Sequence, residues 1–345
     1  MLRVALFAPL VVVNGVTVPA TMNAVQASGT PCSGPDWSCL TMNPNAPVPT
    51  PSSDEALIHV SSSSVNPVDL DRVEPFCVNF ECASGTIGQD MAGTVVAVGE
   101  SCGFSVNDQV WAVGSGAFAD YAVAKCSQMS AKPSSLAFMP SGAIPTVGLT
   151  ALQMLYQTGA PWATDKSVVI ASGQGGTGYM AVQLASKVFG SSRVITAATG
   201  PGIGMVSSLG ATDVVDYHQE DLFDTLANNS VDVVFDNLGF QGTADKALRV
   251  LRSGGVYILL PSANGGTLSP NTKTGVTQIN FGLMQPNTAD LEALAGLFDQ
   301  GSLTTKNMQS FNLVDTPLAF SRKSDGHVLS KITVAVTLQD THEFV

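Results

Sequence analysis

The chain has 345 residues, 45% of them hydrophobic, and its 15 basic and 27 acidic residues give a net charge of −12. This length predicts about two domains, each with a full hydrophobic core. The acidic balance argues against a surface for nucleic acid or an anionic membrane, because phosphate binding needs clustered lysine and arginine, and it favours a soluble protein that handles a small molecule.

The first residues of the chain fit two interpretations. Met1-Leu-Arg3 precedes an apolar run from Val4 to Val13, and Val18-Pro-Ala20 follows with small residues. This order is typical of a secretory leader, and the run is too short to span a bilayer. The letters VVVNGVTV also resemble a β-hairpin that turns at Asn14-Gly15. We interpret residues 1–21 as a leader to the secretory pathway or an organelle lumen, after whose removal no membrane segment remains; otherwise the protein is cytoplasmic.

The cysteines are confined to the first part of the chain. No C-x-x-C pair occurs among them, so a zinc lobe is not indicated. An even number beside a leader permits disulfides, but six cysteines allow 15 pairings, and buried free thiols are the alternative. Asn228-Asn-Ser230 is a glycosylation sequon that matters only in a secreted chain. The cysteines are Cys32, Cys39, Cys77, Cys82, Cys102 and Cys126.

The region that begins near Met22 is predicted to consist of short β-strands. The stretch from Asp54 to Ser64, which contains the apolar run ALIHV, is predicted to be a strand, and three further segments alternate small or polar with apolar residues between polar turns. These segments are GQDMAGTVVAVGE (88–100), VNDQVWAV (106–113) and GAFADYAVA (116–124). The pattern indicates an irregular all-β region.

From Ile144 onward the pattern changes to alternating strands and helices, beginning with the helical spacing of PTVGLTALQML (145–155). This alternation predicts βαβ units around a parallel sheet. A helix at 287–303 and the strand KITVAV (331–336) follow, so we expect both chain ends to share one domain. The alternating segments are SVVIA (167–171), GYMAVQLASKVF (178–189), RVITAA (193–198), IGMVSSLG (203–210), DVVDY (213–217), LFDTLA (222–227), VDVVFDN (231–237), TADKALRVL (243–251) and GGVYILL (254–260).

The stretch SGQGGTG (172–178) lies between the predicted strand SVVIA and the helix that follows it. Glycines in this setting permit a tight turn and close approach of a pyrophosphate, and the helix N-terminus supplies free N–H donors. A purely structural turn is the alternative. The predicted pyrophosphate site consists of Gly173, Gly175, Gly176, Thr177 and Gly178.

The ribose end of this site is less specific. An NAD site usually has Asp or Glu at the end of the second strand, but here that strand ends Ala198-Thr199-Gly200. The missing carboxylate favours NADP(H) over NAD(H). However, no Lys or Arg occurs between Arg193 and Lys246, so a 2′-phosphate would depend on neutral donors such as Thr199 and Tyr217 or on a distant cation.

Several short motifs, in order along the chain, resemble the medium-chain dehydrogenase/reductase superfamily, in its zinc-independent quinone oxidoreductase and enoyl reductase branch. The resemblance implies an α/β fold in which a GroES-like β-barrel domain packs on a Rossmann doubly wound parallel sheet. We therefore expect a GroES-like domain at 22–147, completed by 285–345, and a Rossmann domain at 148–284. The motifs are NPVD (66–69), GQDMAGTVVAVG (88–99), NDQVW (107–111), GAFADY (116–121), PTVGLTA (145–151), the glycine turn, LGA (209–211), DY (216–217), FDNLG (235–239), GH (326–327) and Lys331.

No catalytic zinc is expected. Zinc-dependent relatives bind the metal partly through the His of a Gly-His-Glu motif, where this chain has Gly88-Gln89-Asp90. Glutamine is a poor zinc ligand. The histidines are too scattered in the sequence to replace it; they are His59, His218, His327 and His342.

The resemblance also assigns roles to individual residues. Asn66 and Thr150 are expected near the nicotinamide as catalytic residues, with a turn cap and an ordinary helix threonine as the alternatives. Asn237 and the strand end Leu260-Pro-Ser262 are expected to line the cleft, since ligands gather at the carboxyl ends of parallel strands. Lys331 is either a phosphate or ribose contact or a surface lysine.

The proton donor is the point of departure from relatives. These often have a Tyr soon after the Asn-Pro-x-Asp stretch, whereas no Tyr occurs between Asp69 and Asp120 here. Solvent is then the donor, or Asp71 replaces the Tyr.

These observations favour an NAD(P)H-dependent reductase of a quinone or enone. The alternatives are a dinucleotide-binding protein without turnover and an enoyl reductase that acts in trans on carrier-bound acyl chains. A homodimer through the edge of the Rossmann sheet is expected by analogy, with VYILL (256–260) as the edge strand.

Overall fold

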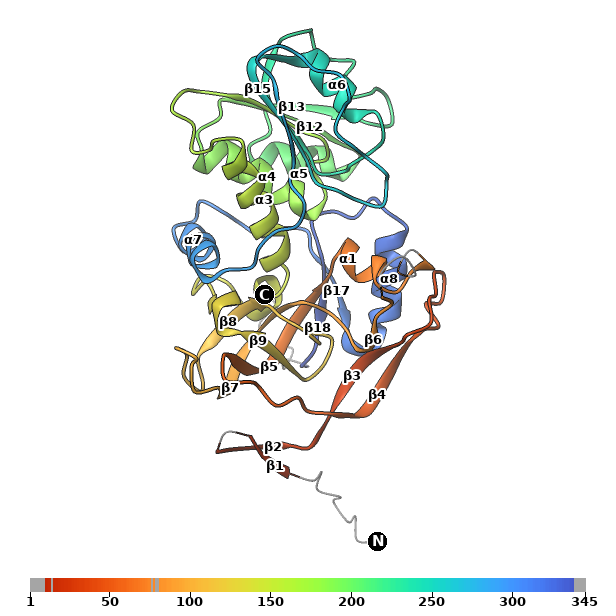
Figure 1. The fold of residues 1–345 in the computed structure, drawn as a ribbon, viewed down its shortest axis with the longest axis vertical. Coiled ribbons are helices and arrows are strands. Elements are labelled where there is room, and N and C mark those ends of the chain that lie inside the picture. Colours follow the sequence, from red (N-terminus) through yellow and green to blue (C-terminus); the bar gives the residue numbers. More distant parts are fainter. Residues whose placement is uncertain (1–9, 14, 76, 78–80, 338–345) are drawn as a thin grey trace.

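The computed structural model describes residues 10–13, 15–75, 77 and 81–337. Its larger sheets form two units, an antiparallel β unit and a parallel sheet covered by helices, which lie at the bottom and the top of Figure 1. In these residues no helix has the length and apolar character needed to cross a membrane. The fold is α/β.

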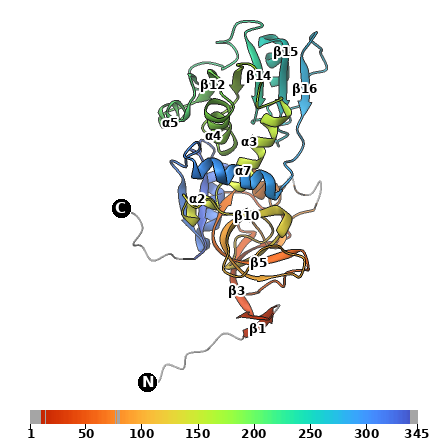
Figure 2. The same ribbon diagram turned by 90° about the vertical axis from the view of Figure 1, so that its left-hand side faces the viewer.

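The predicted leader region contains a hairpin. Strands β1 (Leu10–Val13) and β2 (Val16–Pro19) pair antiparallel with Leu10 opposite Pro19, at the far end of the β unit from the parallel sheet (Figures 1 and 2). The strands of the alternative interpretation are therefore present. Residues 1–9 and the turn residue Asn14 lie outside the described residues, and the leader stays a prediction.

The β unit joins the beginning and the end of the chain. Its main sheet has the order β10-β8-β7-β5-β18-β17, with β9 also on β5, and β18 pairs with β5 so that Ile332 lies opposite Val65. The last strand thus lies beside an early one, as expected. The elements are β3 (Thr21–Ser28), β4 (Leu40–Pro47), β5 (Glu55–Val65), α1 (Pro67–Asp71), β6 (Ser84–Thr86), β7 (Asp90–Val98), β8 (Gln109–Val113), β9 (Tyr121–Lys125), β10 (Met129–Ala131), α2 (Phe138–Ser141), β17 (Gln309–Asn312), α8 (Thr316–Ser324) and β18 (Ile332–Ala335).

The second unit is a parallel sheet in the order β13-β12-β11-β14-β15-β16. Strand order reverses between β11 and β14, which is the point where doubly wound sheets bind ligands at their carboxyl ends. The elements are α3 (Pro145–Gln157), β11 (Ser167–Ile170), α4 (Gly176–Gln183), β12 (Arg193–Ala198), α5 (Pro201–Leu209), β13 (Asp213–Asp216), β14 (Val231–Asp236), α6 (Thr243–Val250), β15 (Leu251–Leu259), β16 (Thr277–Asn280) and α7 (Thr288–Asp299).

The central strand β11 shows why the sheet is covered on both faces. Val168 and Ile170 are fully buried in a core that includes residues of α3, α4 and α5. Val169, which points to the other face, is fully buried in a second core with Ala247 of α6. Consecutive side chains of a strand point to opposite faces, so an uninterrupted apolar run requires cover on both.

Two helices connect the units. Helix α3 packs on α4 and also on β7 and β8, and α7 packs on α3 and β10. Figure 2 shows α7 between the parallel sheet and the β unit. The cleft described below therefore lies between parts that share packed helices.

The cysteines form disulfides within the β unit. The pairs are Cys32–Cys39, Cys77–Cys82 and Cys102–Cys126. This finding decides between the alternatives left open by the sequence, because no cysteine is a free thiol.

Two expectations about the parallel sheet are wrong. LFDTLA forms turns instead of a helix, and the carbonyls of Phe223 and Leu226 accept from the Arg249 guanidinium at 2.6 and 3.1 Å, so this segment is held by α6. VYILL is not an edge strand, since β15 pairs with β16 as well as with β14. Strand β16 has the polar sequence TQIN and was not evident from hydrophobic pattern. The domain boundaries proposed from the sequence stay a prediction.

Candidate active site

A cleft of about 660 Å³ is lined by residues of both units. It contains the carboxyl ends of β11, β14 and β15 on one side and the loop between β5 and α1 on the other. Most of the predicted site residues meet there. Asn66, Thr150, Gly175, Gly176, Thr177, Asn237, Leu260, Ser262 and Lys331 line it, whereas Gly173, Gly178, Thr199 and Tyr217 lie outside its lining.

The positions of the turn require glycine for different physical reasons. A Cβ at Gly178 would lie 1.7 Å from the Ser172 carbonyl oxygen, and one at Gly173 would lie 2.6 Å from Thr196 Oγ1. These two glycines are needed for close packing inside the protein. A Cβ at Gly175 would meet nothing nearer than Ser172 Oγ at 3.9 Å and would project into open space beside the turn. The space beside Gly175 is what a bound phosphate group requires.

The amino end of α4 faces the same turn. Its N-cap residue is Gly175, which has no side chain to accept from the first-turn N–H groups. Such groups have no partner within the helix, and the helix dipole makes them favourable for an anion. Asn237 at the end of β14 supports the turn by accepting the Ser172 N–H at 3.0 Å and donating to its carbonyl at 2.9 Å. Its amide therefore positions the turn while it lines the cleft.

A buried carboxylate, Asp90, organises the floor of the cleft and is inaccessible to solvent. One oxygen accepts from Ser64 Oγ at 2.7 Å and from Asn66 Nδ2 at 2.8 Å. The other accepts the Thr146 N–H at 2.8 Å and its hydroxyl at 2.6 Å. Asp90 thus ties β5 and the start of α3 together beneath the site.

Lys331 is the counter-ion of this carboxylate and not a surface lysine, because it is 4% exposed. Its Nζ donates to Asn66 Oδ1 at 2.7 Å and to the Val65 carbonyl at 3.1 Å, and it lies 3.7 Å from Asp90. Burial lowers the pKa of Lys331, and the charge of Asp90 opposes that shift. Its alkyl chain passes the glycine turn, since a Cβ at Gly176 would lie 2.8 Å from Lys331 Cδ.

The two residues expected near the nicotinamide are both buried. Asn66 is the N-cap of α1, as the alternative interpretation had it, but its side chain is held between Lys331 and Asp90. One N–H of its amide is left for a ligand. Thr150 donates its hydroxyl to the Thr146 carbonyl one helical turn earlier, at 2.7 Å, and keeps its acceptor capacity toward the cleft.

Two carboxyl groups of α1 differ in their access to the cleft. Asp69 is buried and accepts the Asn66 N–H at 2.8 Å; burial, opposed by this bond, raises its pKa to about 7. Asp71 is half-buried and lines the cleft, and burial raises its pKa as well. Asp71 is therefore the carboxyl group that a ligand in the cleft can reach.

Gln89 occupies the position of the metal-binding His of zinc-dependent relatives. Its amide donates to Thr146 Oγ1 at 2.8 Å, so it is part of the same hydrogen-bond network as Asp90. Within the described ranges, no group of three or more His, Cys, Asp or Glu is arranged to hold a metal ion. The side chains at this position do not fit a zinc site.

The predicted ribose residues gather at the outer end of the glycine turn. Gln174 of the turn accepts the Thr199 N–H at 2.8 Å and donates to the Tyr217 hydroxyl at 3.4 Å. Thr199 Oγ1 lies 3.2 Å from His218 Nδ1, and Tyr217 Oη lies 2.6 Å from His327 Nδ1. Sequence reasoning missed both imidazoles: His218 directly follows Tyr217 in the chain and could have been found there, whereas His327 comes from the other unit.

Residues 327–331 of the β unit contact the glycine turn of the other unit. The Ser330 N–H donates to the Gln174 carbonyl at 2.7 Å, and Ser330 forms a β-bridge with Gly175. The residues on each side of it, His327 and Lys331, thereby reach the outer and inner parts of the site. Lys331 was predicted from the sequence, and the signal that could have found His327 was the Gly-His pair at 326–327.

Two protein-family profiles match the chain. A profile described as "Alcohol dehydrogenase GroES-like domain" matches residues 52–148, and one described as "Zinc-binding dehydrogenase" matches residues 209–334. The first covers most of the β unit, and the second runs from α5 through β18.

Among curated proteins, the chain is 31% identical over 236 residues to an "NADPH-dependent alkenal/one oxidoreductase, chloroplastic" of Arabidopsis thaliana. That match covers 65% of this chain and 59% of the relative, so the chain spans less than two thirds of the relative's length. It is 28% identical over 306 residues to a "Chloroplast envelope quinone oxidoreductase homolog" of the same plant, covering 84% of this chain and 92% of the relative.

Among solved structures, the chain is similar to the quinone oxidoreductase from Coxiella burnetii. The TM-score is 0.78 at 25% sequence identity, covering 92% of this chain and 99% of that one. The expected combination of a GroES-like domain and a Rossmann sheet is therefore confirmed.

Proposed function

The chain belongs to the medium-chain dehydrogenase/reductase superfamily, in its zinc-independent quinone oxidoreductase and enoyl reductase branch, and on this premise we propose that it is an NAD(P)H-dependent reductase of α,β-unsaturated carbonyls or quinones. The observation that carries the proposal is a single cleft that joins the glycine turn at Gly175 to Asn66 and Lys331 of the β unit. One cavity thus offers a place for the dinucleotide and, beside it, hydrogen-bonding groups for a carbonyl acceptor.

The residues of the cleft fit a dinucleotide. The open space beside Gly175 and the uncapped N–H groups of α4 suit a pyrophosphate. When bound, the reduced nicotinamide supplies the hydride. We assign cofactor binding to Gly173, Gly175, Gly176, Thr177, Gly178, Thr199, Tyr217, Asn237, Leu260, Ser262 and Lys331, and catalytic roles to Asn66 and Thr150.

The protein's own contribution is electrostatic. Asn66 has one N–H left to orient an acceptor carbonyl, and the charge of Lys331 lies 2.7 Å behind its amide oxygen. A donor fixed in this way stabilises negative charge that develops on the carbonyl oxygen. Asp71 lines the same cleft, and burial raises its pKa, which favours a role as the group that donates a proton to the reduced product. Solvent is the alternative source of that proton.

We propose a preference for NADP(H) over NAD(H). Strand β12 ends Ala197-Ala198 and Thr199 follows, so no carboxylate at that strand end repels a 2′-phosphate. The Arabidopsis relative named above as NADPH-dependent supports the same preference. We also propose that catalysis uses no zinc, because the Gln89 amide donates to Thr146 in place of a metal-binding side chain.

The test is turnover by the purified full chain. We expect loss of NADPH absorbance with members of a panel of benzoquinones, 2-alkenals and cyclic enones, and little turnover with saturated carbonyls as the matched control. Calorimetric binding of NADPH without turnover of any acceptor would support the dinucleotide-binding alternative. Turnover confined to acyl chains on a carrier protein would support the trans-acting enoyl reductase.

Location and assembly follow as lesser proposals. Disulfides form in oxidising compartments, so the paired cysteines support a leader at residues 1–21 and a lumenal destination. N-terminal sequencing of the mature protein tests it. We retain 22–147 with 285–345, and 148–284, as domain boundaries. A homodimer through the edge of the parallel sheet would use β13 or β16, which are its edge strands, and sedimentation analysis tests whether a dimer forms.

A further inference from the structure

The outer end of the glycine turn contains two imidazoles from opposite units. His218 follows β13, and His327 precedes β18. Their ring centroids are 5.5 Å apart, and His327 stacks on Tyr217 with ring planes 13° apart. Each Nδ1 is occupied, by Thr199 and by Tyr217 respectively. In the described part of the chain, no hydrogen bond involves either Nε2, and both residues are exposed.

This corner is where a Rossmann site reads the 2′ position of the adenosine ribose, because Thr199 directly follows the second strand of the sheet. The sequence provides no lysine or arginine between Arg193 and Lys246. The segment contributes a negative charge instead. Hydrogen bonds, first from the Thr199 side chain and then from the His218 N–H, hold the pKa of Asp216 below its usual value.

The lysine and arginine of α8 lie near this corner but are bonded elsewhere or line the cleft beside it. Arg322 donates to Gln309 and to the carbonyls of Gly326 and His327. Lys323 belongs to the lining of the cleft, which does not include His218 or His327; burial lowers its pKa to about 8, so its charge also changes between pH 8.5 and 6.5. Asp325 adds another exposed acid on this side. The imidazoles are the cationic groups in direct contact with Thr199 and Tyr217 in this corner, and the double variant below separates their charge from that of Lys323.

The backbone holds His327 in this place. It has a φ of +53°, a left-handed conformation that a residue with a side chain seldom adopts and that is found at ligand sites. The β-bridge between Ser330 and Gly175 keeps the segment on the glycine turn. The side chain is thus presented to the other unit at a defined position.

We propose that His218 and His327, with Thr199 and Tyr217, form a 2′-phosphate site whose preference for NADP(H) over NAD(H) is set by pH. The inference rests on the proposed function, because it deepens the same dinucleotide site. Imidazole is the side chain type that gains its charge between pH 8 and 5. When the two rings are protonated, they donate charged hydrogen bonds to the phosphate. When they are neutral, the phosphate lies beside the negative Asp216 carboxylate without a compensating charge. Selectivity therefore rises as pH falls.

The experiment is calorimetric titration of the full chain with NADP⁺ and NAD⁺ from pH 8.5 to 6.5, in buffers without phosphate. Over this range a phosphate monoester keeps most of its double charge, since its second pKa is about 6. We expect the NADP⁺/NAD⁺ affinity ratio to rise about tenfold, which is the size of one charge-assisted hydrogen bond. The pair 2′,5′-ADP and 5′-AMP should reproduce the trend without the nicotinamide half.

Three variants separate the explanations. H218Q/H327Q should have a low ratio that no longer changes with pH, and H327R should keep a high ratio at pH 8.5. His59→Gln is the matched control, because His59 packs on Tyr121 in the β unit away from the corner. In His59→Gln the NADP⁺/NAD⁺ affinity ratio should still rise as pH falls. Thermal melting of each variant checks the fold.

The outcomes are distinguishable. A wild-type ratio that stays constant with pH, or a double variant that keeps the trend, overturns the inference and leaves the proposed reductase intact. Failure of both NADP⁺ and NAD⁺ to bind at any pH overturns the dinucleotide site and the inference with it.

Discussion

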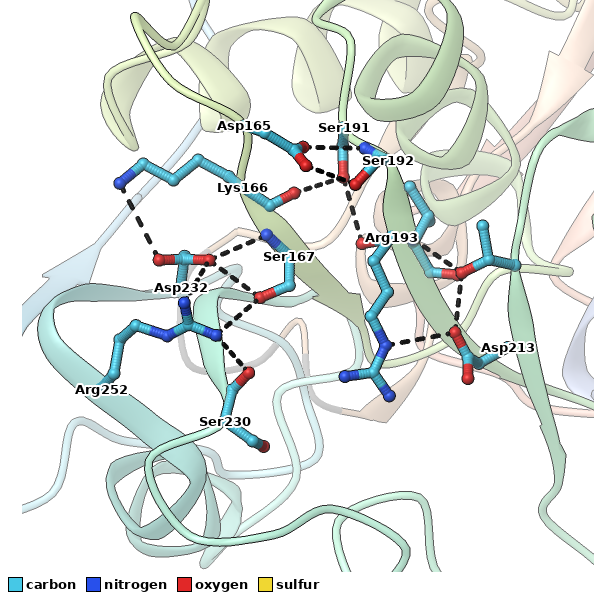
Figure 3. A network of polar contacts seen from close by, with 12 residues as sticks. Asp165, Lys166, Ser167, Ser191, Ser192, Arg193, Asp213, Ser230, Asp232 and Arg252 are labelled. Carbon is cyan, nitrogen blue, oxygen red and sulfur yellow. Dashed lines mark hydrogen bonds and ion pairs between the residues drawn. The ribbon is translucent and has the colours of Figure 1, made fainter.

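The polar groups at the amino ends of the parallel strands differ from those at the carboxyl ends in how they are hydrogen-bonded. At the amino ends of the strands, acids and bases neutralise one another (Figure 3). Asp232 accepts the Ser167 N–H and hydroxyl at 2.9 and 2.8 Å and lies 3.6 Å from Arg252. Arg193 pairs with Asp213 in the same way at 3.4 Å. Nothing in this network needs a ligand.

At the carboxyl ends, donors and acceptors face the cleft. The turn after β11 presents glycines, the end of β14 presents Asn237, and the end of β15 leads to Ser262. The charged pair on this side, Asp90 and Lys331, is buried across the cleft in the β unit. The comparison shows that polar groups at the amino ends bond to one another within the protein. At the carboxyl ends, some donors and acceptors are left to bond to a ligand.

The largest effect is expected at the glycine turn. Gly178→Val places a side chain 1.7 Å from the Ser172 carbonyl oxygen, so the turn must open and the protein should melt at a lower temperature. Gly175→Val has room inside the protein but fills the space proposed for the phosphate. We expect it to fold normally and to lose NADPH affinity by about a hundredfold or more. Gly204→Ala on α5, where a Cβ meets nothing within 4 Å, is the control. Normal affinity in Gly175→Val would contradict the assigned cradle.

The buried pair should be the next most sensitive. Asp90→Asn leaves the charge of Lys331 buried without its counter-ion, and such a loss costs about 3 kcal/mol of unfolding free energy. Urea denaturation measures it. The double variant Asp90→Asn with Lys331→Met should recover part of this stability but not turnover. An unchanged midpoint in the single variant would show that the pair does not support the cleft floor.

Asp71→Asn tests the proton donor. A general acid contributes roughly a hundredfold, so kcat should fall by about that factor while NADPH affinity is retained. The acid must be protonated to act. Because burial raises the pKa of Asp71, activity that depends on it is present below that pKa and declines as pH rises through it. The variant should lose this decline. A pH profile identical to that of the wild type would assign the proton to solvent.

The smallest effect is expected at the amino ends of the parallel strands. Asp213→Asn removes an exposed ion pair whose side chains are 46% and 45% accessible, and such pairs are worth about 1 kcal/mol or less. Cofactor affinity and turnover should not change. A loss of activity in Asp213→Asn would contradict the assignment of a purely structural role to the amino ends of the strands.

The sequence alone determined the features that depend on local pattern. Alternating apolar strands and helices predicted the parallel sheet, and SVVIA followed by the glycine turn predicted the strand, turn and helix of β11 and α4. These predictions succeed because the period of apolar residues and the need for glycine at close approaches are properties of short segments. The helix predicted for LFDTLA was wrong because its apolar pattern is weak and its carbonyls are bound by Arg249, a contact from another segment.

Only the tertiary structure decided which distant residues meet. Lys331 looked equally like a surface residue until β18 placed it beside Asp90, and β16 covered the strand that had been expected at the edge. The cysteine pairs and the meeting of His218 with His327 were likewise undetermined. Contacts between segments far apart in the chain depend on how the two units pack, and no local period of the sequence encodes that packing.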